Sequence, residues 1–365
     1  MQNLSPVFFA LLMLAPAVSA EVQSAFQQKV MQKTGLSVKQ DAGTVSSSDC
    51  QQGAQADEGY WWSDHQAIMG TDITVELWHQ DKRLACSAIA AVMAEMKRID
   101  RVMSPYIETS VLSQLNRKGA YRPVFVGREL FALIEQSLEF SRSTGGAFDI
   151  TYASAGRHYS YRDGLKPDGD TLAAAVDAID YHNLILDVKA QTIAFSKAGV
   201  SVDLGGIGKG YAVDRGIGIL ASLGITQAMV GAGGDSRIIG DRRGQPWVVG
   251  IKNPRSKQDN VAVLPLMDIS VSTSGDYERF FEEKGVRYHH IIDPQTGDSA
   301  RSVRSVTILG AHAATTDALS TSVFVLGVKK GLALINSMEG FDAILVDGEG
   351  QMFVSDSLLQ MSAAR

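Results

Sequence analysis

Apolar residues recur every three or four positions in two long stretches of this chain. In residues 82–103 the spacing predicts an amphipathic helix, and the apolar positions that carry it are Leu84, Ala88, Val92, Met96 and Ile99. Residues 128–143 repeat the pattern and run into Gly145 and Gly146, a typical helix stop. Pro105 closes the first helix because proline cannot continue one.

Shorter runs alternate between apolar and polar residues and predict strands. We expect strands at 67–77, 227–230, 247–251, 262–267, 268–272 and 303–309, and hairpins at 184–195 and 343–354. We expect further helices at 110–116, 171–179, 315–325 and 331–336. Several strands follow one another without a helix between them. That order favours an α+β or mixed-sheet fold over a purely parallel sheet.

The N-terminus differs from the rest of the chain. Residues 7–18 are nearly all apolar, and Val18-Ser19-Ala20 fits a cleavage site, so residues 1–20 are predicted to be a signal peptide. No Lys or Arg precedes the apolar run, which leaves an uncleaved anchor as the alternative. The predicted location is the periplasm, or the periplasmic side of the inner membrane.

The remaining boundaries follow from composition. Residues 21–59 are polar and weakly patterned, so we expect a linker with one short helix near 22–34. The compact domain is predicted to span 60–356, with 357–365 as a C-terminal tail.

The net charge and the cysteines bear on which partners to expect and on whether a disulfide forms. The formal net charge of −6 gives no electrostatic reason to expect nucleic acid as a partner. The two cysteines, Cys50 and Cys86, could pair in an oxidising compartment. Because Cys50 lies in a polar segment and Cys86 on an apolar helix, the interpretation that we favour is that they do not pair.

The most distinctive stretch is residues 200–214, where four glycines fall within 205–210. It predicts a strand, a tight turn and a helix, and the helix N-terminus would suit a phosphate. Its spacing fits neither the dinucleotide-binding G-x-G-x-x-G motif nor a P-loop. The alternative is a glycine turn that only permits close packing.

Other residues suggest chemistry when they are taken singly. Asp317 and Thr321 share one face of a predicted helix and offer hard oxygen ligands for Mg²⁺ or Ca²⁺, although a helix cap and a core threonine would read the same way. His290 and Asp293 could bind phosphate or relay a proton, or could simply be a surface histidine and a turn former. Tyr106 could stack on a flat ring. The sequence contains no G-x-S-x-G and no H-E-x-x-H, so a serine hydrolase or zinc protease has no support.

Taken together and in chain order, seven segments within residues 66–354 resemble the ApbE family of FAD:protein FMN transferases. They are Met69-Gly70-Thr71, residues 98–106 from Arg98 to Tyr106, residues 146–151, residues 203–211, Gly233-Gly234-Asp235, residues 290–297 and residues 316–321. The resemblance implies an α+β fold of the T-fold-like type, with mixed or antiparallel sheets and packed helices around an FAD cleft.

The resemblance also implies a site, position by position. The residues that would line the FAD site are Met69, Tyr106, Ala147, Phe148, Asp149, Asp203, Lys209 and Ile291. His290 would lie beside it, and with Asp293 and Asp203 it is a candidate for the base. The Gly206 carbonyl, Asp317 and Thr321 would hold Mg²⁺.

The implied reaction moves FMN from FAD to a Thr or Ser hydroxyl of an exported or membrane acceptor protein, such as an electron-transfer flavoprotein subunit, and releases AMP. Two alternatives stay open: a Mg²⁺-dependent FAD pyrophosphatase that gives FMN and AMP, and a non-catalytic periplasmic protein that binds FAD.

Overall fold

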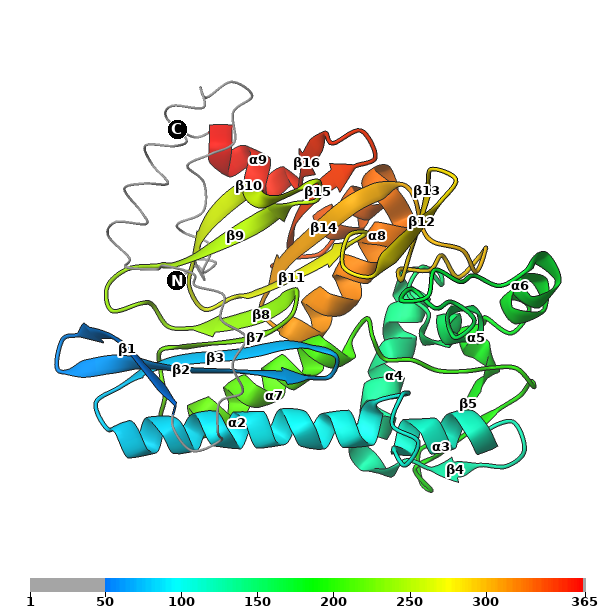
Figure 1. Cartoon of the computed structure of the whole chain (residues 1–365), viewed down its shortest axis with the longest axis horizontal. Coiled ribbons are helices and arrows are strands. Elements are labelled where there is room, and N and C mark those ends of the chain that lie inside the picture. The colour runs from blue at the N-terminus through cyan, green and yellow to red at the C-terminus, as the bar shows by residue number, and fades with distance from the viewer. Residues whose placement is uncertain (1–49, 364–365) are drawn as a thin grey trace.

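The computed structural model describes residues 50–363 and is built around a nine-stranded antiparallel sheet (Figure 1). Its strand order is β1-β2-β3-β7-β8-β11-β14-β15-β16. These strands are β1 Gln51–Ala56, β2 Gly59–Ile68, β3 Thr71–His79, β7 Ala228–Ala232, β8 Asp235–Ile239, β11 Ser270–Gly275, β14 Val303–Gly310, β15 Asp342–Asp347 and β16 Met352–Val354. Mixed helix and antiparallel sheet confirm the predicted α+β class.

Three small sheets and ten helical segments complete the described part of the chain. The small sheets are β4 Val124–Phe125, β6 Thr192–Phe195 and β5 Leu184–Asp187; β9 Trp247–Asn253 with β10 Ser256–Leu266; and β12 Phe280–Glu283 with β13 Val286–His289. The α-helices are α2 Lys82–Met103, α3 Val111–Lys118, α4 Gly127–Ser143, α5 Ala153–Gly156, α6 Gly169–Val176, α7 Gly208–Ser222, α8 Ala313–Asn336 and α9 Asp356–Ala363. Two 3₁₀ turns, η1 Ile150–Tyr152 and η2 Tyr181–Asn183, complete the set.

The large sheet carries cores on both faces. On one face α2 and α7 pack together under β3 and β7, and the buried cluster there includes Val92, Met96 and Val213. On the other face the β9–β10 hairpin and α9 enclose a second cluster that includes Trp247 and Leu358 (Figure 1). The sheet therefore supports elements from both halves of the chain at fixed positions.

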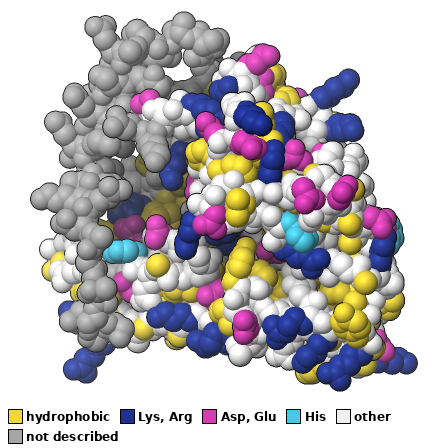
Figure 2. All heavy atoms as spheres, turned by 45° about the vertical axis from the view of Figure 1, so that its right-hand side comes forward, with side chains coloured by type: hydrophobic (Ala, Val, Ile, Leu, Met, Phe, Trp, Pro, Cys, Tyr) yellow, Lys and Arg dark blue, Asp and Glu magenta, His cyan; other side chains and the backbone are white. Residues whose placement is uncertain are grey.

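Helix α8 connects the core of the domain with the candidate functional site described below. Among the described helices it alone is long and apolar enough to cross a membrane by length and composition, but half of its most apolar window is buried within the protein. A kink at Gly327, with φ 74°, divides it close to where we expected two separate helices. On the face shown in Figure 2, acidic, basic and apolar side chains are interspersed.

One predicted strand is in fact a hairpin. Residues 67–77 were expected as a single strand with a glycine break, but β2 ends at Ile68 and β3 begins at Thr71. Met69 and Gly70 turn the chain with φ values of 57° and 69°. Two consecutive residues with positive φ form the tight turn that suits antiparallel strands. The Gly70 position therefore reverses the chain instead of interrupting a strand.

The ordered domain is longer than we expected at both ends. Strand β1 lies inside the segment that we expected to be a linker, and pairs with β2. Helix α9 lies where a tail was expected, and its Leu358 is fully buried. The predicted signal peptide and the short helix near 22–34 lie outside the described residues.

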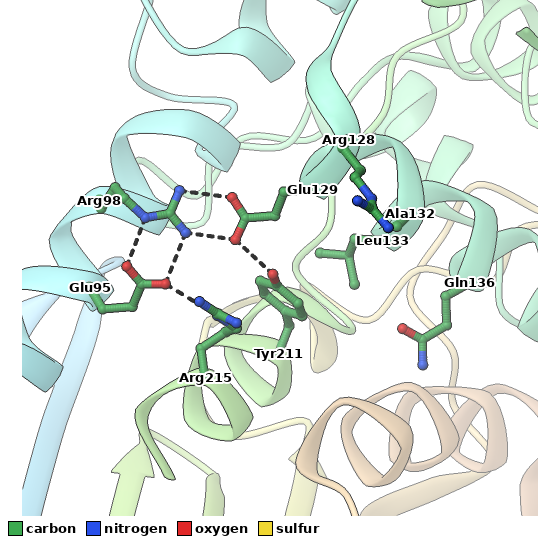
Figure 3. A pocket seen from close by; sticks show the side chains of 9 residues that line it. All are labelled: Glu95, Arg98, Arg128, Glu129, Ala132, Leu133, Gln136, Tyr211 and Arg215. Atoms are coloured by element: carbon green, nitrogen blue, oxygen red, sulfur yellow. Dashed lines mark hydrogen bonds and ion pairs between the residues drawn. The ribbon is translucent and has the colours of Figure 1, made fainter. Parts of the chain in front are cut away.

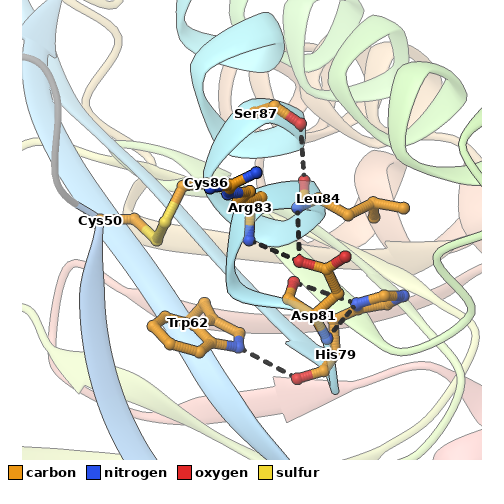
Figure 4. The surroundings of a disulfide bond; sticks show 8 residues. All are labelled: Cys50, Trp62, His79, Asp81, Arg83, Leu84, Cys86 and Ser87. Carbon is orange, nitrogen blue, oxygen red and sulfur yellow. Dashed lines mark hydrogen bonds between the residues drawn. A yellow bond between two sulfur atoms is a disulfide. The ribbon is translucent and has the colours of Figure 1, made fainter.

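The expectation that Cys50 and Cys86 stay unpaired is wrong, because the structure joins them in a disulfide (Figure 4). Cys50 immediately precedes β1, and Cys86 lies in the second turn of α2. Since β1 pairs with β2, and β2 packs on α2, the two cysteines meet through tertiary structure.

We expect loss of this disulfide to destabilise the domain. The bond closes a loop with a sequence separation of 36, and the chain-entropy model gives such a loop about 4 kcal/mol. The free energy of unfolding of the Cys50→Ser, Cys86→Ser double variant, measured by urea titration without reductant, should fall by up to about that amount. Equal unfolding midpoints for native and variant proteins would show that the bond contributes nothing.

Candidate functional site

The segment that leads into the glycine turn is extended but is not a strand, which corrects our expectation for residues 200–204. Side chains form hydrogen bonds with several of its backbone N–H and carbonyl groups. The Asn116 amide accepts from the Val202 N–H at 2.8 Å and donates to the Val202 carbonyl at 2.8 Å. The Ser154 hydroxyl accepts from the Ser201 N–H at 3.0 Å. The turn is thus fixed by α3 and α5 instead of by a sheet.

Beyond the turn, the first residues of α7 contact the first residues of α8. The Gly210 N–H donates to Asp317 at 3.0 Å. A Cβ at Gly210 would lie 2.1 Å from the Ala313 carbonyl oxygen, so only glycine fits there. In return, Asp214 of α7 accepts from the Ala313 and Ala314 N–H groups at 3.0 and 2.9 Å and caps α8. The two helix starts, a hundred residues apart, form one unit.

Between these helix starts lies a cluster of two buried acids and one partly exposed lysine. Lys209 contacts the Asp235 carboxylate, and its Nζ lies 3.4 Å from Asp317 Oδ1. Asp235 and Asp317 are 1% and 2% exposed. Burial and the charge of Asp235 raise the pKa of Asp317. Burial alone would lower the pKa of Lys209, but the two carboxylates outweigh that effect and raise it. Two acids against one base leave a buried excess of negative charge, which favours a further cation.

The predicted metal ligands lie together at this cluster. Thr321 follows Asp317 by one helical turn, and a Cβ placed on Gly206 would lie 3.1 Å from Thr321 Oγ1. No group of three His, Cys, Asp or Glu side chains suited to a metal occurs among residues 50–363. A carboxylate, a hydroxyl and a carbonyl form a hard but incomplete oxygen set. Such a set fits Mg²⁺ whose remaining ligands are phosphate oxygens and water.

Phe148 lies beside the glycine turn, whereas Asp149 is engaged in local structure. A Cβ on Gly206 would lie 3.1 Å from the Phe148 ring, and Ala147, half-buried, precedes that ring. The Asp149 carboxylate accepts from Thr151 and from the Tyr181 N–H at 2.9 Å. Burial raises the pKa of Asp149 in spite of these bonds. Asp149 therefore shapes the wall of the site through the backbone that it holds.

Asp203, half-buried, lies among aromatic and basic groups. Its Oδ1 accepts from the Gly205 N–H at 2.7 Å. Burial raises the pKa of Asp203, while Gly205 and the Arg279 guanidinium act against the rise. Burial and the charge of Asp203, with Tyr106 nearby, raise the pKa of Tyr152 well above its ordinary value. The predicted residues Asp203 and Tyr106 thus belong to one site, and Tyr106 presents a ring that is 78% exposed.

His290, half-buried, joins this group through Arg279. The His290 N–H donates to the Arg279 carbonyl at 3.1 Å, and the Arg279 guanidinium donates to the Gly70 carbonyl at 3.1 Å, beside Met69. The buried His290 Nδ1 has no hydrogen-bond partner among the described residues. Burial, with the nearby His289, Arg279 and Lys209, lowers the pKa of His290 to about 3.

This low pKa predicts a pH effect on stability. The unfolded histidine, with a pKa near 6.5, binds a proton below that pH while the folded one does not, so acid favours unfolding. His290 therefore lets the free energy of unfolding fall by about 1 kcal/mol from pH 6.5 to pH 5.5. In urea titrations at both pH values, the His290→Gln variant should lose less stability than the native protein over this range. An identical loss in both would contradict the assignment.

Two further predicted residues also hold local structure. The Asp293 carboxylate accepts from the Gln295 N–H at 2.9 Å and its carbonyl accepts from Gly297 at 2.8 Å, so this residue holds the turn 293–297. Ile291 is 5% exposed and packs in the core beneath β14 and α8.

Three residues near the site could not be assigned from the sequence. Tyr152 and Arg279 were missed, and Asp235 was given no role. Only the position of Asp235 after two glycines within a recognised segment hinted at it.

A cavity of about 490 Å³ lies elsewhere, between α2, α4 and α7 (Figure 3). Arg98 pairs there with Glu95 and Glu129, and the Tyr211 hydroxyl donates to Glu129 at 2.7 Å. Tyr211 follows Lys209 by two residues and thus leaves the opposite side of α7. None of the predicted site residues lines this cavity, so its network braces α7 from behind.

Comparison with known proteins shows the family of this chain. The model of the ApbE family matches residues 69–345, and the chain belongs to that family. It is 34% identical over 306 residues to the FAD:protein FMN transferase of Treponema pallidum, covering 78% of this chain and 84% of the relative. The crystal structure of the ApbE protein of Thermotoga maritima superposes with a TM-score of 0.76 at 35% identity, covering 82% of this chain and 98% of that one. The flavin transferase ApbE of Vibrio cholerae gives 0.74 at 26% identity, covering 83% and 99%.

Proposed function

We propose that this protein is a Mg²⁺-dependent FAD:protein FMN transferase that acts on an exported or membrane acceptor protein. The names of its relatives support the transferase class and FAD as substrate. The single observation that carries the proposal is the cluster of Asp317, Asp235 and Lys209 beside the glycine turn. It joins two almost fully buried carboxylates to one partly exposed lysine.

The roles of the residues follow from their surroundings. Asp317, Thr321 and the Gly206 carbonyl would hold Mg²⁺, which neutralises the diphosphate and the charge that develops on the leaving phosphate. Lys209 balances the buried carboxylates and contributes a positive charge toward the diphosphate. Tyr106 offers an exposed face on which a flat ring of FAD stacks. The segment from Ala147 to Asp149, with Met69 and Ile291, forms the walls.

The chemical step is a phosphoryl transfer in which atoms balance. The oxygen of a Thr or Ser hydroxyl attacks the FMN-side phosphorus of FAD and forms a phosphoester. The bond between that phosphorus and the bridging oxygen breaks, and AMP leaves with the bridging oxygen. The hydroxyl proton passes to a base in the cleft. Asp203, His290 and Asp293 are the candidates. The Asp203 and Asp293 carboxylates each accept one backbone N–H, from Gly205 and Gln295, and burial makes Asp203 a stronger base than an ordinary aspartate.

The disulfide supports an oxidising location. Structural disulfides persist in exported proteins and are rare in the cytosol, and Cys50 is joined to Cys86. Together with the apolar segment 7–18, this pairing favours the periplasm or the periplasmic side of the inner membrane. Fusion of residues 1–25 to a reporter enzyme that is active only after export tests this directly.

The function is tested by incubating the purified protein with FAD, Mg²⁺ and candidate electron-transfer flavoprotein subunits. Covalent flavin on a Thr or Ser of one subunit, together with AMP, is the expected result. Free FMN and AMP with no labelled subunit would instead indicate a pyrophosphatase. FAD that is bound but unchanged would indicate a carrier.

A further inference from the structure

Arg279 connects three segments at the rim of the candidate site. It lies between β11 and β12, and its side chain is exposed. Its guanidinium donates to the Gly70 carbonyl in the β2–β3 turn, and its own carbonyl accepts from His290, both at 3.1 Å. A Cβ on Gly70 would lie 3.2 Å from Arg279 Nη2, so the side chain lies close against this turn. Arg279 is therefore held in place at the edge of the cleft.

Its guanidinium differs from those of the neighbouring arginines. Arg255 and Arg287 both form ion pairs with Asp276, and Arg301 pairs with Asp298. Across residues 50–363, by contrast, no carboxylate lies within ion-pair distance of Arg279 that would neutralise its charge. A guanidinium has five N–H donors, and within residues 50–363 the Arg279 side chain makes one hydrogen bond, to the Gly70 carbonyl. A fixed cation with free donors is thus available to a ligand.

The charges of the site indicate which ligand. Lys209 and the divalent cation proposed above bring positive charge, but Asp203, Asp235 and Asp317 already offset it. An FAD diphosphate that contacts Lys209 and the cation would therefore still leave the site with a net negative charge. Arg279 acts electrostatically on both Asp203 and His290, so its charge reaches the site. The planar fork of an arginine also matches phosphate oxygens better than a single ammonium does.

We propose that the Arg279 guanidinium binds the diphosphate of FAD. This inference rests on the proposed function, because it takes FAD as the substrate. Arg279 is then a substrate-binding residue that completes the neutralisation begun by Lys209 and the metal. It approaches from the connection between β11 and β12, beside the β2–β3 turn, whereas Lys209 approaches from α7.

Two fragments of FAD separate this role from others. ADP carries the diphosphate without the flavin, and riboflavin carries the flavin without phosphate. With Mg²⁺ present, the Arg279→Gln variant should bind ADP and FAD about 10- to 100-fold more weakly than the native protein, as loss of a charged hydrogen bond predicts. Riboflavin should bind equally to both. Calorimetry measures ADP, and flavin fluorescence measures riboflavin and FAD.

Further variants guard against a merely structural effect. Arg279→Lys keeps a donor for the Gly70 carbonyl and the charge, so it should recover part of the ADP affinity. Arg128→Gln removes an exposed arginine on α4, outside the site, and should change nothing. Thermal melting of each variant identifies any that has lost its fold, and the comparison then rests on the lysine variant.

Two results would overturn the proposal. One is an unchanged ADP affinity in a folded Arg279→Gln variant, and the other is a loss of riboflavin affinity as large as that of ADP. The transfer assay is run on the same native preparation. Failure of the transfer assay would count against the proposed function. The binding comparison would still test whether Arg279 binds the diphosphate.

Discussion

Replacing Asp317 with asparagine is expected to reduce Mg²⁺-dependent FMN transfer at least about 100-fold. Changes to groups that merely support a metal ligand cost 10- to 100-fold, and Asp317 is assigned as a ligand itself. Asparagine keeps the shape of the side chain but removes the charge from a site in which Asp317 is 2% exposed. It leaves one carboxylate against Lys209, so the excess negative charge that favours a cation disappears.

The measurement is the initial rate of covalent flavin formation over a series of Mg²⁺ concentrations. The variant should need far more Mg²⁺ than the native protein to reach half of its maximal rate. Asp342→Asn is the matched control, because Asp342 is also buried and accepts from Ser355, but on β15 outside the site. If the Asp317→Asn variant showed the same Mg²⁺ dependence as the native protein, the assignment of Asp317 as a metal ligand would be wrong.

Replacing Gly210 with alanine should destabilise the protein by about 3 kcal/mol or more, at the upper end of overpacking effects. The added Cβ would lie 2.1 Å from the Ala313 oxygen and 2.8 Å from the Ala314 nitrogen. Both are backbone atoms at the start of α8, so no rotamer change relieves the clash. The helix starts must separate, and Asp317 would then lose its bond from the Gly210 N–H.

Urea titration measures this effect, and the same helix supplies its control. Gly218 is exposed in α7 and a Cβ there meets nothing within 4 Å. Gly218→Ala should therefore stabilise the protein by about 0.5–1 kcal/mol, the usual gain for this change within a helix. If Gly210→Ala raised the unfolding midpoint in the same way, the close contact between α7 and α8 would be refuted.

Elements that are set by local pattern could be predicted from the sequence. The apolar spacing of residues 82–103 predicted α2 with its observed ends, and the hairpins β5–β6 and β15–β16 formed where alternation predicted them. The turn at Met69 and Gly70 was missed because a glycine within an alternating run looks the same whether the chain continues or reverses.

Features that depend on distant partners could not be predicted in this way. The Cys50–Cys86 disulfide depends on the pairing of β1 with β2. Residues 200–204 alternate as a strand would, but their hydrogen-bond partners include the side chains of Asn116 and Ser154 and the Ile150 carbonyl, none of which lies in a strand. In both cases the local pattern carried no information about what lies opposite.

The candidate site likewise contains residues that could be singled out from the sequence and residues that could not. Asp317 and Thr321 share one helical face, but that spacing also fits a helix cap and a core threonine, so their assignment as metal ligands came from the family resemblance. The glycine turn was singled out by its unusual composition. Asp235 and Arg279 were not assigned, since an acid after two glycines and an arginine in a turn are common. Their meaning appears only when Lys209 and His290 are brought beside them.

The most direct test of the proposed function is intact-mass spectrometry of an acceptor subunit incubated with this protein, FAD and Mg²⁺. We predict that the subunit gains the mass of one FMN less one water, at a Thr or Ser, with one AMP released for each flavin attached. The native protein releasing FMN and AMP while every acceptor keeps its original mass would contradict the account.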